Sequence, residues 1–223
     1  MNEENKNVCN NIMVIRKTYL CIRKGLQHMI YLVRHGQTAW NLEKKTQGHT
    51  DIPLNEKGRN QAKILAQVIS NLKIDKIISS DLLRARETAE IINEKIGKNI
   101  TYDERIREIN YGILEGAPRD TLTQEMWDIY NTCPEELKAE TKTHVFERIK
   151  TFFDELQDSK DNTLIITHGG ALRMIMYYAK NRNEFDNNIY IKYFKDIKIN
   201  NADIFEWKDE IKSIQKRGID ILF

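Results

Sequence analysis

Two histidines, each followed by a glycine, are the residues whose surroundings point most directly to chemistry. His35 comes after the apolar run at residues 29–33 and Arg34, and His168 comes after the apolar run at residues 164–167. Such runs predict buried strands, and open α/β sheets bind ligands at the carboxyl ends of their strands. One strand-end histidine is more often structural, whereas two in the same arrangement predict a shared site.

Arg34 and Arg84 would bring guanidinium groups to the same site. Arg84 falls in the first turn of a predicted helix, where free backbone amides favour anions. Two guanidiniums, imidazoles and oriented amides suit a tetrahedral dianion such as phosphate. Gly36 and Gly169 lack a Cβ, which would let the backbone approach a bound oxyanion. Taken alone, Arg84 would be a solvated helix residue, and Arg86 is expected at the surface.

A zinc site is the alternative chemistry for two histidines and a carboxylate. Arg34 and Arg84 among the same residues would repel a cation, so we expect no metal and no other cofactor. The three cysteines, Cys9, Cys21 and Cys133, show no metal-ligand spacing and cannot all pair with one another. This usage predicts a reducing compartment, and therefore a cytoplasmic protein.

The bulk composition indicates a globular protein with no general affinity for polyanions. The chain has 223 residues, of which 40% are hydrophobic and 30% charged, and its net charge is +2. This length suits one buried core, and the small net charge gives no field for nucleic acid. No apolar run approaches the roughly 20 residues that span a bilayer.

The first 28 residues differ from the rest, because they begin polar and then mix apolar with basic side chains. We expect residues 1–28 to be an extension that is disordered or reflects a misassigned translation start. Residues 29–223 would then form a single domain. A basic amphipathic helix at residues 12–26 on a membrane surface is the less favoured alternative.

Strands and helices alternate along the remainder. Strands are expected at residues 29–33, 76–78, 100–102 and 163–167, with a hairpin at 199–207 and 211–214. Helices are expected at residues 55–72, 82–96, 122–130, 143–156 and 170–179. Asn55 and Asp81 would cap the first two helices, and Gly97 would end the second. The alternation predicts an α/β fold: a doubly wound, mainly parallel sheet flanked by helices, with an antiparallel edge strand.

Residues 32–41, Leu-Val-Arg-His-Gly-Gln-Thr-Ala-Trp-Asn, resemble the signature of the histidine phosphatase superfamily, the phosphoglycerate mutase-like proteins. The resemblance continues in family order through residues 47–48, 51–58, 79–85, 108–116, 167–173 and 200–202. It covers roughly residues 29–215 and favours the phosphatase branch.

The resemblance implies a role for each site residue. His35 would be the nucleophile that forms a phosphohistidine, with His168 stabilising charge on the phosphoryl oxygens. Glu108 would be the general acid for the departing alkoxide and then the general base for water. The substrate would be bound by Arg34, Thr38, Asn41, Gly48, Arg84 and the backbone amide of Gly169.

The interval between Glu108 and His168 favours hydrolysis over return transfer. Its 60 positions leave room for a short lid only, whereas mutases of the family generally carry a long insertion there. A wetter pocket favours water as the acceptor. We therefore expect a metal-independent phosphomonoester hydrolase. A cofactor-dependent phosphoglycerate mutase is the alternative, and a non-catalytic binding protein is less favoured because no site residue is missing.

The substrate stays open beyond a small phosphorylated metabolite. Phosphatase relatives often have Gly-Glu-Ser before the long helix, where this chain has Ala139-Glu140-Thr141. Trp127, Tyr130 and Cys133 would contact the leaving group or simply pack a helix. Sugar phosphates, phosphoglycerates, phosphoserine and ribazole phosphate are all compatible with these residues, and so are a monomer and a homodimer.

Overall fold

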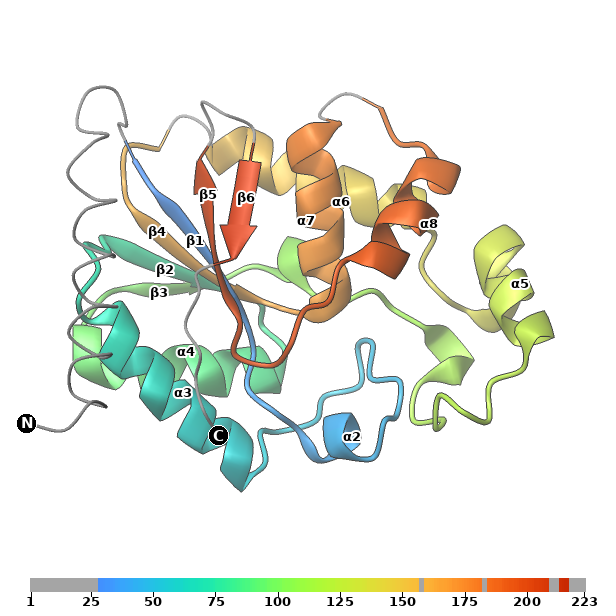
Figure 1. Ribbon diagram of the computed structural model, residues 1–223, viewed down its shortest axis with the longest axis horizontal. Helices are drawn as coiled ribbons and strands as arrows, with labels where there is room; N and C mark the ends of the chain where they lie inside the picture. The colour runs from blue at the N-terminus through green and yellow to red at the C-terminus, as the bar shows by residue number, and fades with distance from the viewer. Residues whose placement is uncertain (1–27, 157–158, 182–183, 209–212, 217–223) are drawn as a thin grey trace, which may run out of the picture.

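A twisted sheet lies between two sets of helices in one half of the molecule (Figure 1). The computed structural model describes residues 28–156, 159–181, 184–208 and 213–216. Within these residues the sheet has six strands in the order β3-β2-β4-β1-β5-β6. The strands are β1 Ile30–Arg34, β2 Lys76–Ser79, β3 Ile100–Tyr102, β4 Thr163–Thr167, β5 Ile204–Lys208 and β6 Ser213–Lys216.

The strand directions confirm the predicted doubly wound architecture. Strands β3, β2, β4 and β1 pair in parallel, whereas β5 is antiparallel to β1 and β6 is antiparallel to β5. The α-helices are α2 Ala39–Leu42, α3 Glu56–Ile69, α4 Leu83–Ile96, α5 Gln124–Thr132, α6 Lys142–Leu156, α7 Gly169–Lys180 and α8 Asn187–Asp196. Short 3-10 helices lie at Glu104–Ile106, Gly112–Leu114 and Pro134–Leu137.

Helices cover both faces of the sheet, α3 and α4 on one and α6 and α7 on the other (Figure 1). Alternate residues of β1 serve the two faces. Leu32 belongs to the cluster with α6 and α7, whereas Tyr31 and Val33 belong to the cluster with α3 and α4. The period of two along a strand explains this division, and burial on both faces explains why the run is apolar throughout.

The pairing of β1 with β4 aligns the two strand ends that matter for chemistry. The register runs from Ile30 opposite Thr163 to Arg34 opposite Thr167. Beyond the last pair, the backbone N–H of His35 donates to the carbonyl of Thr167 at 3.0 Å. Both histidines therefore leave the same edge of the sheet as neighbours.

The boundaries of the first two long helices follow the expected signals in part. The side chain of Asn55 accepts from the backbone N–H of Gly58 at 2.8 Å, which confirms it as the cap of α3. Gly97 ends α4 with a left-handed φ of 62°, as a C-terminal glycine should. Helix α3 stops at Ile69, three residues before the predicted end.

The prediction of Asp81 as the cap of α4 is wrong. Leu82 occupies the cap position and makes no side-chain capping bond. The carboxylate of Asp81 instead pairs with the guanidinium of Arg107. A distant residue takes over, because Asp51 Oδ1 accepts from the backbone N–H of Leu83 at 2.6 Å. The carboxylate of Asp81 pairs with Arg107 and is therefore not available to cap α4, and the sequence alone does not predict this pairing.

The C-terminal third shows the largest departures from expectation. Strand β5 begins at Ile204 and not at residue 199, because residues 200–203 form a turn in which Asn200 N–H donates to Asp203 Oδ2 at 2.7 Å. Helix α8 was not predicted; Asp186 caps it by accepting from the backbone of Asn188 and Ile189. The second hairpin strand lies two residues later than expected. The interpretations placed on residues 1–27 concern a segment outside the described residues.

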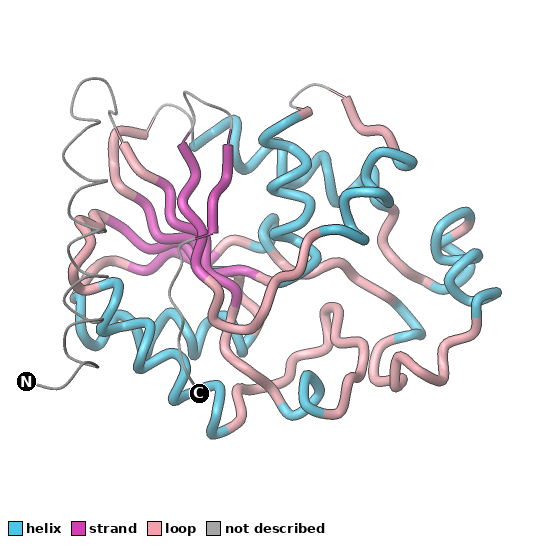
Figure 2. Tube along the Cα trace, viewed as in Figure 1, coloured by secondary structure: helices cyan, strands magenta, loops and turns pink. Residues whose placement is uncertain are grey.

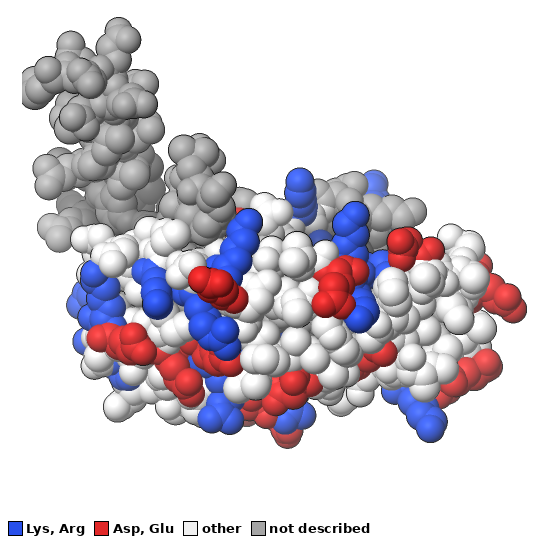
Figure 3. Space-filling model, turned by 90° about the horizontal axis from the view of Figure 1, so that it is seen from below, with Lys and Arg blue, Asp and Glu red and all other residues white. Residues whose placement is uncertain are grey.

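The sheet occupies one half of the molecule, and helices and loops make up most of the other half (Figure 2). On the face seen in Figure 3, basic and acidic side chains are interspersed and no large area carries one sign of charge. Among the described residues, no helix combines the length and apolar character needed to cross a bilayer.

Candidate active site

The two strand-end histidines lie next to each other. The ring centroids of His35 and His168 are 5.1 Å apart, with an angle of 56° between the ring planes. The side chains are almost closed to solvent, at 2% and 0% exposure. The arrangement expected from the repeated His-Gly pattern is therefore present.

Hydrogen bonding fixes the tautomer of His35. Its Nδ1 lies 2.7 Å from the carbonyl oxygen of Gly36, which can only accept, so Nδ1 carries the hydrogen. The Nε2 atom then keeps its lone pair. Burial holds the pKa of His35 well below 6.5, and the positive charges of Arg84 and Arg34 lower it further. The ring is a neutral imidazole with a nucleophilic nitrogen.

His168 is also held neutral, with the opposite tautomer. Its Nδ1 accepts from Arg84 Nε at 3.2 Å, which leaves the hydrogen on Nε2. That Nε2–H donates to Ser80 Oγ at 2.8 Å. Burial lowers the pKa of His168 well below 6.5, with Arg84 as the next cause. Ser80, at the end of β2, is a site residue for which the sequence interpretation gave no role.

Arg84 is fully buried in the first turn of α4, and backbone carbonyls hold it. Its Nη2 donates to Gly48 O at 2.7 Å and its Nη1 donates to Thr50 O at 3.0 Å. Burial lowers the pKa of Arg84 to about 10, so the guanidinium stays charged near neutral pH. The contribution of Gly48 to the site is thus a carbonyl that orients this arginine.

Glu115 shapes the loop that holds Arg84. Its carboxylate accepts from the backbone N–H of His49 at 2.9 Å, of Thr50 at 2.7 Å and of Tyr111 at 3.0 Å. A Cβ on Gly48, where φ is +56°, would lie 1.9 Å from Glu115 Oε1. Only glycine allows this loop to fold over the carboxylate. The sequence motif contained Glu115, but its type gave no indication of this role.

Arg34 has an unused hydrogen-bond donor at the site. Its Nη1 donates to the carbonyl of Ile199 at 2.9 Å, whereas its buried Nε has no hydrogen-bond partner among the described residues. That Nε would lie 3.4 Å from a Cβ placed on Gly169. Desolvation lowers the pKa of Arg34 to about 10. A buried, unpaired donor on a cation is costly unless an acceptor from outside the chain binds there.

Asn41 and Thr38 close the side of the site next to α2. Asn41 Oδ1 accepts from Thr38 N–H at 3.1 Å and from Asn201 Nδ2 at 3.0 Å, which leaves the amide hydrogens of Asn41 as donors. The hydroxyl of Thr38 donates to Gln47 Oε1 at 3.0 Å and accepts from Asn41 N–H at 3.1 Å. Thr38 therefore serves as the cap of α2 and has its hydroxyl hydrogen in use.

The carboxylate of Glu108 lies at the N-terminus of α7. Its oxygens accept from the backbone N–H groups of Gly170 and Ala171, each at 3.0 Å. Free amides and the helix dipole stabilise an acid in this position. A Cβ on Gly170 would lie 2.3 Å from Glu108 Oε1, so the second glycine after His168 makes room for the carboxylate.

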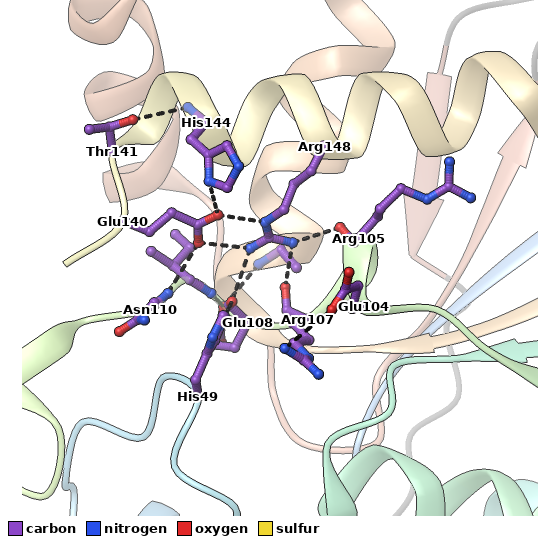
Figure 4. A network of polar contacts seen from close by, with 12 residues as sticks. His49, Glu104, Arg105, Arg107, Glu108, Asn110, Glu140, Thr141, His144 and Arg148 are labelled. Carbon is purple, nitrogen blue, oxygen red and sulfur yellow. Dashed lines mark hydrogen bonds and ion pairs between the residues drawn. The ribbon is translucent and has the colours of Figure 1, made fainter. Parts of the chain in front are cut away.

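Arg148 of α6 holds the backbone on which Glu108 is mounted (Figure 4). Its Nη1 donates to the carbonyls of Arg105 at 2.6 Å and Arg107 at 2.8 Å, and its Nη2 donates to that of Glu108 at 2.9 Å. The carboxylate of Glu140 pairs with the same guanidinium at 2.7 and 3.0 Å. Sequence interpretation missed this residue, since an arginine within a helix resembles any solvated one.

Glu140 and Thr141 retain contacts despite the departure from Gly-Glu-Ser. Glu140 accepts from the backbone N–H of Asn110 at 3.2 Å and lies 2.9 Å from His144 Nδ1. Thr141 Oγ1 accepts from the backbone N–H of His144 at 3.1 Å, as a serine in that position would (Figure 4). The change from serine to threonine therefore preserves the cap of α6.

The family model of the histidine phosphatase superfamily (branch 1) matches residues 30–210. The chain belongs to this superfamily. A relative named probable phosphoglycerate mutase GpmB, from Escherichia coli, is 39% identical over 154 residues, which are 64% of this chain and 70% of that protein.

Two solved structures share the fold. Phosphoserine phosphatase from Entamoeba histolytica has a TM-score of 0.70 at 23% identity and covers 85% of this chain and 94% of its own. Mycobacterial glucosyl-3-phosphoglycerate phosphatase has a TM-score of 0.65 at 24% identity, and the match covers 80% of this chain and 92% of that protein's chain. Among the described residues of this histidine phosphatase, no three His, Cys, Asp or Glu side chains are grouped as metal ligands.

Replacing Arg148 with methionine tests the network behind Glu108. Arg148→Met leaves the buried Glu140 and three carbonyls without their partner, so we expect a loss of about 3–5 kcal/mol in unfolding free energy, measured by urea denaturation. The control is Lys150→Met, which removes an exposed pair with Asp154 on the same helix and should cost under about 1 kcal/mol. Equal losses in the two variants would contradict the assignment.

The neutral imidazoles predict a pH dependence of stability. The unfolded chain binds protons at histidine as pH falls below about 6.5, whereas buried His168 does not, so the folded state loses stability on acidification. Between pH 7 and 5.5 this loss is about 1 kcal/mol for each buried imidazole. We measure the unfolding free energy by urea denaturation at pH 7 and at pH 5.5. The decrease between these two pH values should be about 1 kcal/mol smaller for His168→Asn than for the wild type. An unchanged pH slope would show that His168 titrates normally.

Proposed function

We propose that this histidine phosphatase hydrolyses phosphomonoesters of small metabolites through a phosphohistidine on His35. The observation that carries the proposal is the meeting of a neutral, buried imidazole with two guanidiniums, one of which has an unpaired Nε. This is a site with donors for a phosphoryl group and a nucleophile beside them.

In the first step, His35 Nε2 attacks phosphorus and the ester P–O bond breaks. Arg34 and Arg84 bind the non-bridging oxygens, together with the amide of Asn41 and the backbone N–H of Gly169. His168 joins them when its Nε2–H exchanges Ser80 Oγ for a phosphoryl oxygen. Charge that builds on these oxygens is stabilised by donors already in position. Thr38 and Gly48 act by positioning: Thr38 caps α2, and Gly48 orients Arg84 through its carbonyl.

Glu108 moves the protons. It gives a proton to the oxygen of the leaving group as the first bond breaks. It then takes a proton from water, whose oxygen attacks the phosphohistidine and releases His35 and inorganic phosphate. Its anchorage on the amides of Gly170 and Ala171 supports this assignment, because it holds the carboxyl beside the strand end of His168.

The reaction proceeds without a metal ion in this proposal. The groups that face the phosphoryl position are guanidiniums and imidazoles, and of the two rings only His35 keeps a free lone pair, because Arg84 donates to the Nδ1 of His168. Cationic arginines supply the charge stabilisation that a metal ion gives in other phosphatases.

Water is the acceptor that we favour. The named phosphatases among the structural neighbours agree with hydrolysis, and the interval from Glu108 to His168 is short. The name of the Escherichia coli relative keeps phosphoglycerate mutase activity as the second candidate. An assay of 3-phosphoglycerate for isomerisation alongside phosphate release separates the two.

A pair of variants tests the nucleophile and the acid with 4-nitrophenyl phosphate. Nitrophenolate leaves without a proton, so Glu108→Gln should release one equivalent in a burst and then slow at least 100-fold, with acid-labile phosphate on the protein. His35→Ala should give neither burst nor labelling. Rapid-quench kinetics and phosphate labelling measure both. Labelling of His35→Ala, or full turnover by Glu108→Gln, would refute the roles assigned.

Metal independence is tested with a chelator. Incubation with excess EDTA followed by desalting should leave hydrolysis of 4-nitrophenyl phosphate within about twofold of the untreated rate, because arginine charges do the stabilising. Loss of activity that zinc or magnesium restores would overturn this part of the proposal.

A further inference from the structure

A cavity of about 320 Å³ adjoins the proposed catalytic groups. Glu108, Gly169 and Gly170 line it, together with residues of the segment from Arg119 to Lys142. A leaving group attached to a phosphoryl group beside Glu108 would extend into this space. Its lining therefore indicates what kind of leaving group the protein accepts.

Positive charge dominates the lining. Arg119, Lys142 and Arg173 are its cations, and Glu108 is its one acidic side chain. The carboxylate of Glu108 is already bound to two backbone amides of α7. Arg119 forms no ion pair with any residue in the described part of the chain, and the residue is exposed. The cavity thus carries an excess of cations over acids.

Lys142 is the most informative of these cations. Its Nζ donates to Asn131 Oδ1 at 2.8 Å and lies 4.6 Å from the centre of the Tyr130 ring. Burial lowers its pKa to about 8, and no carboxylate of the described residues raises it in return. A flexible lysine could extend into water instead, so its inward position indicates a place for an anion.

Aromatic rings form the apolar part of the same wall. Tyr130 packs against Tyr111 with ring centroids 5.3 Å apart and against the edge of Trp127 at 5.9 Å. Flat apolar surface beside cations suits a carbon skeleton that carries an oxyanion.

We propose that Lys142 and Arg119 bind a second oxyanion, a carboxylate or a phosphate, on the leaving group of the substrate, with the aromatic wall covering its carbon skeleton. The inference rests on the proposed phosphatase function and identifies the class of ester for that site. Phosphate esters of neutral alcohols are then poor substrates, and esters with an anionic group a few bonds from the phosphoryl oxygen are good ones.

Three matched esters test the proposal: 4-methylphenyl phosphate, 4-(carboxymethyl)phenyl phosphate and 4-(phosphonomethyl)phenyl phosphate. The methylene group insulates the leaving oxygen from the added charge, so leaving-group chemistry stays similar. We expect the wild-type kcat/KM to be at least tenfold higher for one or both anionic esters than for 4-methylphenyl phosphate. The larger ratio distinguishes a carboxylate from a phosphate as the preferred group.

Variants assign the preference to Lys142. The ratio of anionic to neutral kcat/KM should fall about tenfold in Lys142→Met, mainly through KM, and should not change in Lys150→Met, which removes a lysine charge elsewhere on α6. A wild-type ratio near one overturns the proposal whether or not the variants fold, and so does a ratio that Lys142→Met leaves intact. Hydrolysis of 4-methylphenyl phosphate tests the phosphatase function separately. If no ester is hydrolysed, that function fails and this proposal fails with it.

Discussion

The parallel pairing of β1 with β4 is the constraint on which the rest of the structure depends. It brings two segments more than 130 positions apart to one edge of the sheet, with Arg34 opposite Thr167. His35 and His168 then follow as neighbours, and α7 starts directly beside them. The helices on both faces fix this pairing by burying alternate side chains of β1.

This pairing places two arginines at the centre of the site that have no carboxylate partner among the residues that the structure describes. Arg84 is oriented by carbonyls and by an imidazole, and Arg34 by a carbonyl. The nearby acidic side chains bind backbone amides instead of these arginines. Glu115 accepts from the loop around Arg84, and Glu108 accepts from the N-terminus of α7. Burial keeps both imidazoles neutral, and the same cations lower the pKa of each ring further. The interior is therefore prepared for an anion, with little rearrangement left for binding.

Sequence reasoning predicted the sheet, most helices and the residues that meet at its edge, because apolar periodicity and repeated motifs are local signals. It could not assign Asp81, whose carboxylate is taken by Arg107, a partner 26 positions away. It also missed Arg148 and Ser80, whose roles depend on which backbone groups fold beside them. Thr38 was expected to line the pocket, yet its hydroxyl is occupied within the chain. The type of a residue therefore indicates which chemistry its side chain can perform, but it does not indicate which group that side chain binds in the folded protein.

The cavity beside Glu108 has a further consequence for how this enzyme could diverge. The groups proposed to bind the phosphoryl group belong mainly to strand ends and helix starts, whereas Lys142, Arg119 and the rings of Trp127 and Tyr130 in the cavity lining belong to one stretch of chain. Exchanges within that stretch would alter which alcohol is accepted and leave the transfer machinery intact. On the proposed function, the residues that select the alcohol are separate in the chain from those that transfer the phosphoryl group, so a new specificity could arise without rebuilding the chemistry.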